Sequence, residues 1–135
     1  MIIEDPELLS LFRLPGPCEY CGRLCPWGRD PAHIFARGLG GGSQVDIREN
    51  IVSLCRVCHT DSHAGNRPLR CDLLALAAAR EGVLQADIER VVFDLLRLPK
   101  RSESEAALVL CGLRGHPWWQ PPGETSRSAK ASPTA

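Results

Sequence analysis

Runs of apolar residues in the first half of the chain predict one helix and two strands. Over residues 2–14 the apolar side chains follow a helical spacing, and the proline after Asp5 favours a helix start there. Residues 31–36 form a short apolar segment that leads into a glycine-rich bend at residues 38–42, as at the end of a strand. Residues 47–54 are expected to form a loop followed by a second strand. These two segments should pair as an irregular antiparallel hairpin.

The rest of the chain carries the 3.6-residue period of helices. A short helix is predicted over about residues 57–64, and further helices over 72–80, 85–98 and 102–110. Their apolar stripes would pack on the first half of the chain, because a unit of about 50 residues buries too little surface by itself. The chain is therefore predicted to be an α+β protein. We divide it into an N-terminal helix packing on the core (1–17), a central unit (18–68), a helical extension (69–112) and a tail that its Pro, Ser and Thr content predicts to be disordered (113–135).

Four of the seven cysteines form two widely separated Cys-x-x-Cys pairs, Cys18/Cys21 and Cys55/Cys58. Such pairs suit one tetrahedral zinc ion, because each pair grips the metal from its own turn and the ion fastens two distant segments together. An odd cysteine count fits poorly with a framework of disulfides. Two alternatives remain open: Cys25 could replace one of the ligands, and the thiols could be buried without a metal.

The composition is that of a single small domain of 135 residues, 44% of them hydrophobic. The start of the chain lacks an apolar leader and no stretch approaches about 18 apolar residues, so we predict a cytoplasmic protein without a membrane partner. The formal net charge is zero, which gives no general attraction to nucleic acid. Arginine outnumbers lysine fourteen to two, and guanidinium groups suit phosphate, although genomic base composition accounts for this bias equally well.

Three histidines are candidates for chemistry beyond the cysteine site. His59 and His63 follow the second cysteine pair at a spacing of four, so they share a helical face and could bind one divalent cation. His33 lies in the first predicted strand, and imidazole titrates near neutral pH, as a general base requires. The alternatives are a satisfied core histidine at position 33, and a solvent-facing helix or an additional zinc ligand at positions 59 and 63.

The order of these residues resembles the HNH nuclease motif, a ββα-metal (His-Me) finger, in its zinc-braced subgroup with four cysteines. The resemblance covers roughly residues 18–66. It rests on the two cysteine pairs, Ala-His-Ile at 32–34, Arg-Gly-x-Gly-Gly at 37–41, Glu-Asn-Ile-Val-x-Leu-Cys at 49–55 and Cys-His-x-x-x-His at 58–63. It implies a small ββα-metal finger with a structural zinc site, packed on additional α-helices.

The resemblance further implies a metal-dependent endonuclease that hydrolyses DNA phosphodiester bonds. Such an enzyme would nick or cleave DNA with low sequence specificity and leave 5′-phosphate and 3′-hydroxyl ends. In this chain His33 would be the base, Asn50 would brace the loop, and His59 and His63 would hold a catalytic cation such as Mg²⁺, Mn²⁺, Ni²⁺ or Zn²⁺. Small members of this kind occur in phage and mobile elements, which suggests a phage-like setting.

One position departs from the family pattern. Many members carry a metal-binding Asp or His immediately before the base histidine, where this chain has Ala32. Asp30, two residues earlier, is a possible replacement ligand. For contacts with phosphate the candidates are the arginines in and beside the motif, Arg37, Arg48 and Arg56.

Ala32 and the zero net charge favour a competing hypothesis, a non-catalytic zinc-finger module that binds nucleic acid or protein. A nuclease that acts on RNA or on branched DNA is a third possibility. A protein partner could be contacted through the C-terminal helices or through Trp118 and Trp119, although these tryptophans could equally anchor the tail.

Overall fold

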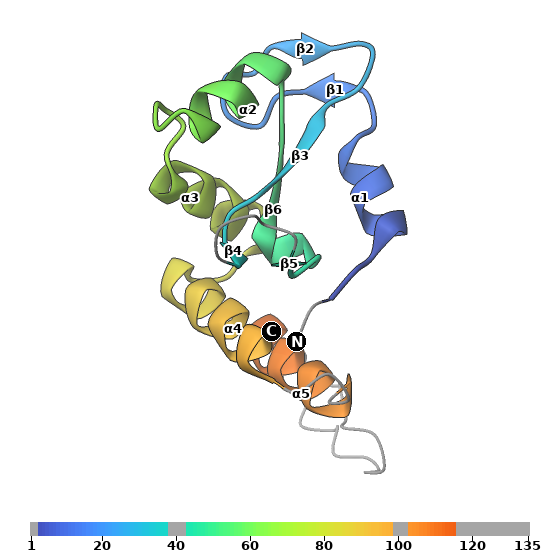
Figure 1. The fold of residues 1–135 in the computed structure, drawn as a ribbon, viewed down its shortest axis with the longest axis vertical. Coiled ribbons are helices and arrows are strands. Elements are labelled where there is room, and N and C mark those ends of the chain that lie inside the picture. Colours follow the sequence, from blue (N-terminus) through green and yellow to red (C-terminus); the bar gives the residue numbers. More distant parts are fainter. Residues whose placement is uncertain (1–2, 38–42, 99–102, 116–135) are drawn as a thin grey trace.

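In the computed structural model of the protein, residues 3–37, 43–98 and 103–115 are described. Within these residues the chain forms five α-helices, one 3₁₀ helix and three two-stranded antiparallel sheets (Figure 1). The predicted α+β class is therefore confirmed. The glycine-rich bend at 38–42, and the tail from residue 116 with Trp118 and Trp119, lie outside the described residues.

The first helix is α1 (Pro6–Phe12). It begins as predicted, because the Asp5 side chain caps it by accepting a hydrogen bond from the Leu8 N–H at 3.1 Å and proline occupies the first turn. Phe12, at its end, is buried. The carbonyl of Phe12 accepts a hydrogen bond from the Ser53 hydroxyl at 2.7 Å, which ties the end of α1 to the central strand pair.

The predicted antiparallel pairing is confirmed for β3 (Asp30–His33) and β6 (Ile51–Leu54). In this pair Asp30 lies opposite Leu54 and His33 lies opposite Ile51. Two smaller sheets flank it: β1 (Gly16–Pro17) pairs with β2 (Leu24–Cys25), and β4 (Ala36–Arg37) pairs with β5 (Ser43–Gln44).

The predicted strand over 31–36 is interrupted after His33. The physical reason lies at Phe35, whose backbone N–H and C=O are hydrogen-bonded by the side chain of Asn50 instead of by a neighbouring strand. The chain resumes as β4, which pairs with β5 rather than with β6. One predicted strand therefore becomes two, in two different sheets.

Four of the remaining helices follow the predicted order with shifted ends: α2 (Arg56–His63), α3 (Arg70–Glu81), α4 (Gln85–Arg97) and α5 (Glu103–Arg114). The 3₁₀ helix η1 (Arg48–Asn50) lies in the segment predicted as a loop. Gly82 ends α3 in the left-handed conformation at φ 73°, which glycine adopts without strain. The last helix continues past residue 112, the predicted end of the helical extension, to Arg114. None of the described helices is both long enough and apolar enough to cross a membrane.

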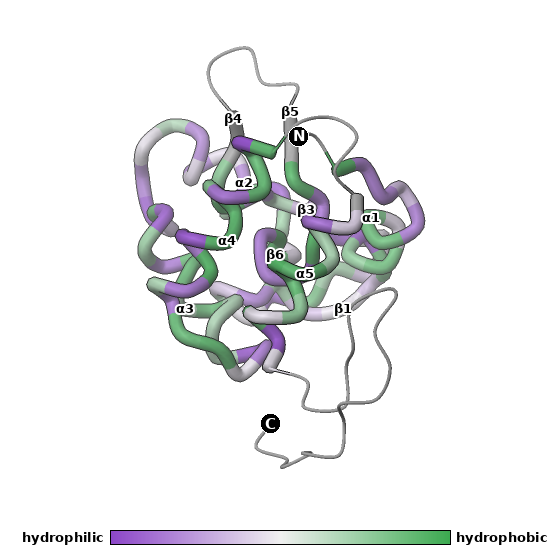
Figure 2. The backbone as a smooth tube through the Cα atoms, turned by 90° about the horizontal axis from the view of Figure 1, so that it is seen from below, coloured by the Kyte–Doolittle hydropathy of each residue, from purple (hydrophilic) through white to green (hydrophobic). Residues whose placement is uncertain are grey.

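The core lies between the β3–β6 pair and the helical extension. All four residues of β6 are buried, so this strand is covered on both faces. β6 lies near the centre of Figure 2. The apolar stripe that predicted α4 is the buried face of that helix: Ile88, Val91, Val92 and Leu95. Each such side chain stabilises the fold by roughly 1.5–3 kcal/mol when fully buried, so the extension supplies core that the central unit lacks.

Two buried or half-buried ion pairs also tie the extension to the central unit. Arg80 of α3 donates from Nη1 to both carboxylate oxygens of Glu19, at 2.7 and 2.9 Å, in the turn that carries the first cysteine pair. Arg114 of α5 forms a bidentate pair with Glu49 through Nε and Nη2, at 2.7 and 3.0 Å, and Glu49 is only 2% exposed. A bidentate pair fixes orientation as well as distance, so α5 is held in register with η1, while Arg80 ties α3 to the cysteine turn.

Candidate metal centre and histidine cavity

The two cysteine pairs are brought together from the β1–β2 turn and from the start of α2. Each pair uses the same local geometry, in which the first sulfur accepts a hydrogen bond from the backbone N–H of the second cysteine. The distances are 3.5 Å for Cys18 and Cys21 and 3.4 Å for Cys55 and Cys58. In the second pair Cys55 is also the N-cap of α2, so the position of this helix depends directly on the cysteine site.

The geometry of the four sulfurs fits zinc. All four Sγ atoms lie within 4.8 Å of one another, and those of Cys21 and Cys55 are 3.8 Å apart. A tetrahedral ion with Zn–S bonds of about 2.3 Å separates its sulfur ligands by roughly 3.8 Å. In the described part of the chain this is the one group of three or more candidate ligands close enough to hold a single ion. The predicted cysteine cluster is thus present and suits a structural metal.

The pKa values of the cysteine thiols in the cluster also favour a bound cation. Burial raises the pKa of the Cys58 thiol, and the neighbouring sulfurs of Cys55, Cys21 and Cys18 raise it further. Burial also opposes ionisation of Cys18, but hydrogen bonds from nearby backbone N–H groups outweigh it and lower the pKa of that thiol to about 7. One thiolate thus forms easily, whereas four such close thiolates need a cation to offset their repulsion.

Cys25 stands outside this cluster. Its thiol donates a hydrogen bond to the Arg23 carbonyl at 3.5 Å. Burial raises its pKa, as do the neighbouring sulfurs. Cys25 is not one of the four cysteines whose sulfurs lie within 4.8 Å of one another, so the structure gives no support to Cys25 as a substitute ligand.

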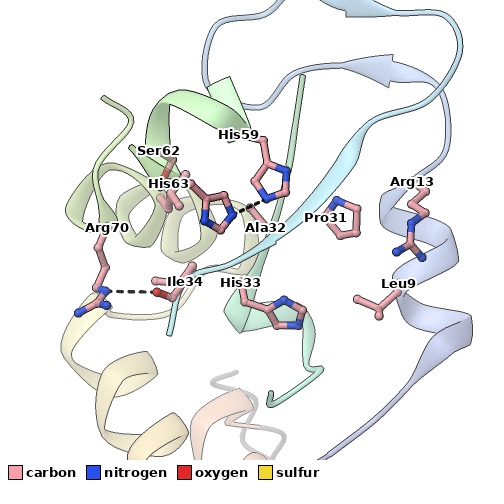
Figure 3. Close-up of a pocket in the computed structure, with 11 residues that line it drawn as sticks. Leu9, Arg13, Pro31, Ala32, His33, Ile34, His59, Ser62, His63 and Arg70 are labelled. Atoms are coloured by element: carbon pink, nitrogen blue, oxygen red, sulfur yellow. Dashed lines mark hydrogen bonds between the residues drawn. The ribbon is translucent and has the colours of Figure 1, made fainter. Parts of the chain in front are cut away.

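The three candidate histidines line one cavity of about 600 Å³, drawn in Figure 3. His33 comes from the end of β3, and His59 and His63 come from α2. Arg13, just after α1, and Arg70, at the start of α3, also line it, and none of the described residues that line it is acidic. The ionisable groups that the described residues place on this wall are therefore cationic or can become so, which suits an anionic ligand.

The histidines lie along the cavity in two groups. His59 and His63 come together, with their Nε2 atoms 3.1 Å apart, and β3 runs between this pair and His33 in the view of Figure 3. Two nitrogen ligands bound at about 2.1 Å to one metal lie roughly 3.0–3.4 Å from each other. The pair therefore has the spacing of two ligands of one ion, and the remaining positions would fall to oxygens of water or substrate.

Asp30 contacts the Nδ1 edge of the His59 ring, opposite the Nε2 edge that faces His63. Its carboxylate is 3.1 Å from His59 Nδ1 and 2.8 Å from Arg56 Nε. Burial raises the pKa of Asp30, but the hydrogen bonds from His59 and Arg56 outweigh burial and hold the pKa below its ordinary value. An ionised carboxylate accepts the Nδ1 proton and leaves the Nε2 lone pair available. Asp30, a possible ligand by its sequence position, thus orients His59 in this structure.

His33 is held in a contact that the sequence did not predict. Its Nε2 lies 2.7 Å from Oδ1 of Asp46, and the side chains are 12% and 4% exposed. The other carboxylate oxygen of Asp46 accepts the backbone N–H of Asp5 at 2.8 Å. The one sequence signal for Asp46 was an acidic residue between two apolar ones, Val45 and Ile47.

Asn50 spans the loop between the strands. Its side-chain oxygen accepts the Phe35 N–H at 2.9 Å, and its amide donates to the carbonyls of Phe35 and Val45 at 3.1 and 3.0 Å. Its own carbonyl accepts the Ile34 N–H at 2.9 Å. Asn50 is fully buried, so these bonds fix the chain directly after His33 without competition from water.

The three predicted phosphate-binding arginines have different surroundings. Arg56 lines a second hollow together with His59 and His63. Arg48 pairs with Glu81 at 3.3 Å and is not among the residues that line the histidine cavity. The side chain of Arg37 lies outside the described part of the chain.

Arg13 and Arg70, which do line the cavity, were missed. Arg70 Nε donates to the Ile34 carbonyl at 3.2 Å (Figure 3). These two arginines are far apart in sequence and lie at opposite ends of the site drawn in Figure 3, so no local pattern indicated that both would line one cavity.

Comparison of the chain with protein-family models, with curated proteins and with solved structures finds no match. The cysteine cluster and the histidine cavity are therefore the features from which a function can be inferred.

Proposed function

We propose that the protein is a metal-dependent endonuclease of the HNH type that hydrolyses phosphodiester bonds in DNA. The observation that carries this proposal is the shared cavity of His33, His59 and His63, which has two arginines and no acid on its wall. The element order supports it, because an antiparallel strand pair followed by a helix, here β3, β6 and α2, is the arrangement that a ββα-metal finger requires.

Phosphodiester hydrolysis needs a group that takes a proton from the attacking water. His33 is suited to this role, because imidazole titrates near neutral pH and the side chain lines the cavity while its other contacts hold it still. Asn50 supports this role by hydrogen-bonding the backbone of Phe35 and of Val45, on either side of the segment from Ala36 to Gln44. The base is thereby carried on a rigid strand end.

His59 and His63 would hold the catalytic cation through the two Nε2 atoms. When bound there, a divalent ion would stabilise negative charge on the phosphate and on the leaving 3′-oxygen. Asp30 keeps His59 in the tautomer that such binding needs. Imidazole ligands favour Zn²⁺, Ni²⁺ or Mn²⁺, and Mg²⁺ would depend on the oxygens of water and substrate.

Arg13 and Arg70 give the cavity its fixed positive charge, whereas the charge of Arg56 at the neighbouring hollow is offset by its ion pair with Asp30. Guanidinium groups bind phosphate oxygens in a fork, but such contacts carry no sequence information. Low sequence specificity follows for a domain of this size. We infer products with 5′-phosphate and 3′-hydroxyl ends.

The cysteine cluster would have a structural role. A zinc ion held there would join the β1–β2 turn to the first turn of α2, and α2 carries both histidines of the proposed catalytic pair. The structural ion would therefore set the distance between that pair and β3 without taking part in the reaction.

The proposal is tested by nicking of supercoiled plasmid, with each of Mg²⁺, Mn²⁺, Ni²⁺ and Zn²⁺ added in turn. The wild type should nick in the presence of a divalent ion and stop when it is chelated. The His59→Ala/His63→Ala double variant should lose on the order of 100-fold or more of this activity while retaining one tightly bound zinc per chain. A wild type that nicks no DNA with any of these ions would overturn the proposal.

One observation favours a second candidate, a non-catalytic zinc module that binds nucleic acid or protein. The cysteine cluster is the one group of three or more ligands found among the described residues, and the second site offers two protein ligands, with Ala32 at the position of a third. Metal titration separates the two candidates. A binding module would hold one zinc per chain and show no further site that the double histidine variant removes.

A further inference from the structure

We infer that Asp46 is a positioning residue for His33, one that keeps the proton of the neutral imidazole on Nε2 and leaves Nδ1 as the basic nitrogen. The inference rests on the proposed function, because it assigns the atom of His33 that would take the proton from water. It starts from the contact between Oδ1 of Asp46 and Nε2 of His33, which at 2.7 Å is among the short hydrogen bonds of this structure.

The direction of this hydrogen bond follows from the chemistry of its two partners. A carboxylate oxygen accepts hydrogen bonds, whereas each imidazole nitrogen can donate or accept according to the tautomer. The contact therefore selects the tautomer in which Nε2 carries the proton. Asp46 does not line the cavity, whereas His33 does. Within the described residues no hydrogen bond is found at Nδ1, so this nitrogen is the one left for a reacting water.

Asp46 cannot easily turn away from His33, because backbone groups of the N-terminal segment also form hydrogen bonds with it. Its second oxygen accepts the Asp5 N–H at 2.8 Å, and its own N–H donates to the Ile3 carbonyl at 2.9 Å. Ile3 and Val45 form a parallel β-bridge beside this contact. A backbone N–H can only donate, so one oxygen of Asp46 is committed to Asp5 and the other is aimed at His33.

Burial gives the contact its strength. Asp46 is 4% exposed and the His33 side chain is 12% exposed, and hydrogen bonds gain strength where water is excluded. The carboxylate would also stabilise the positive imidazolium that forms when His33 accepts a proton. The segment from Ile3 to Asp5 therefore acts on the base through Asp46, although it contributes no group that contacts the reacting atoms.

Asp46→Asn is the informative substitution, because it keeps the shape and changes one acceptor into a donor. The fixed N–H of Asp5 needs an acceptor, so the amide oxygen should turn to Asp5 and the NH₂ group to His33. Nε2 would then have to accept, and the ring proton would move to Nδ1. The base nitrogen would be blocked while the fold is retained.

The experiment measures the tautomer and the rate separately on the full-length, zinc-loaded protein. Ring ¹⁵N chemical shifts of His33 should report a proton on Nε2 in the wild type and on Nδ1 in Asp46→Asn. Single-turnover plasmid nicking by this variant should fall on the order of 10²- to 10⁴-fold with little change in DNA affinity. Asp94→Asn, which alters an acid paired with Arg97 on α4, is the matched control and should change neither quantity.

The inference is overturned if the wild-type ring carries its proton on Nδ1, a measurement that needs no variant to fold. It is also overturned if Asp46→Asn leaves the tautomer unchanged, or switches the tautomer and still nicks at the rate of the wild type. A wild type that does not nick removes the proposed function instead. The ¹⁵N shifts then decide on their own whether Asp46 sets the tautomer of His33.

Discussion

The Nε2 atoms of His59 and His63 face each other across one turn of α2 at 3.1 Å. This distance suits a hydrogen bond in which one ring donates to the other, and it also suits the proposed cation between the two nitrogens. Asp30 occupies the Nδ1 edge of His59 at 3.1 Å, which leaves the Nε2 lone pair for the shared position. With a cation bound at the proposed pair, the carboxylate, the histidine and the metal would lie in series.

We predict that Asp30→Asn weakens the binding of Mn²⁺ or Ni²⁺ at this pair by roughly 10- to 100-fold, because a neutral amide makes His59 a weaker ligand. Isothermal titration calorimetry on the zinc-loaded protein measures the affinity. His63→Ala should abolish the binding, and Asp94→Asn on α4 should leave it unchanged. Equal affinities in Asp30→Asn and the wild type would show that Asp30 does not act through His59.

The cysteine cluster yields a prediction about folding. Cys21→Ala should reduce the bound zinc well below one per chain and lower the thermal midpoint strongly, since the free energy of metal binding is available only to the folded state. Cys25→Ala provides the control, because Cys25 is buried but lies outside the cluster, whereas Cys21 is an exposed member of it. It should retain zinc. Zinc content by mass spectrometry and Co²⁺ substitution spectra measure both variants, and loss of zinc from Cys25→Ala alone would contradict the assignment.

Arg13 is expected to bind the DNA backbone at the histidine cavity. Arg13→Ala should weaken DNA binding for every sequence to a similar degree and reduce the slope of log K against log salt by about 1. Arg97→Ala, an exposed arginine on α4 that pairs with Asp94, should leave the slope unchanged. Fluorescence anisotropy over a salt series measures the slope. Identical slopes for Arg13→Ala and the wild type would place the phosphate contacts elsewhere.

The pair of Glu49 and Arg114 predicts that α5 is an integral part of the fold. Arg114→Ala leaves a carboxylate that is 2% exposed without its partner, which should lower the free energy of unfolding by about 2 kcal/mol, less than for a fully buried pair because Arg114 is partly exposed. Glu49→Gln/Arg114→Ala should recover part of this loss, since no buried charge is then left unpaired. Urea unfolding measures both. A double variant that is no more stable than Arg114→Ala would contradict this account.

The sequence predicted those parts of the fold that depend on local spacing. The Cys-x-x-Cys pairs, the two histidines four residues apart and the apolar stripe of α4 each follow from the geometry of one turn or one helix. Predicted ends were less accurate where tertiary contacts decide them. The strand over 31–36 is cut short because Asn50, far along the chain, binds the backbone of Phe35.

The surroundings of the histidines could not be predicted in the same way. Asp46 reaches His33 because the N-terminal segment docks beside it, and Arg13 reaches the cavity because the end of α1 packs on β6. Both contacts join residues far apart in sequence. No pattern along one chain distinguishes these side chains from the other charged residues of the sequence.

Removal and chemical replacement of the proposed base is the most direct test of the nuclease account. Single-turnover plasmid nicking is measured for the wild type and for His33→Ala, with saturating Mn²⁺ and with or without added imidazole. We predict that His33→Ala nicks on the order of 10²- to 10⁴-fold more slowly, and that imidazole entering the vacated space beside Asp46 restores part of the rate. Nicking by His33→Ala at the rate of the wild type would contradict the assignment of His33 as the base.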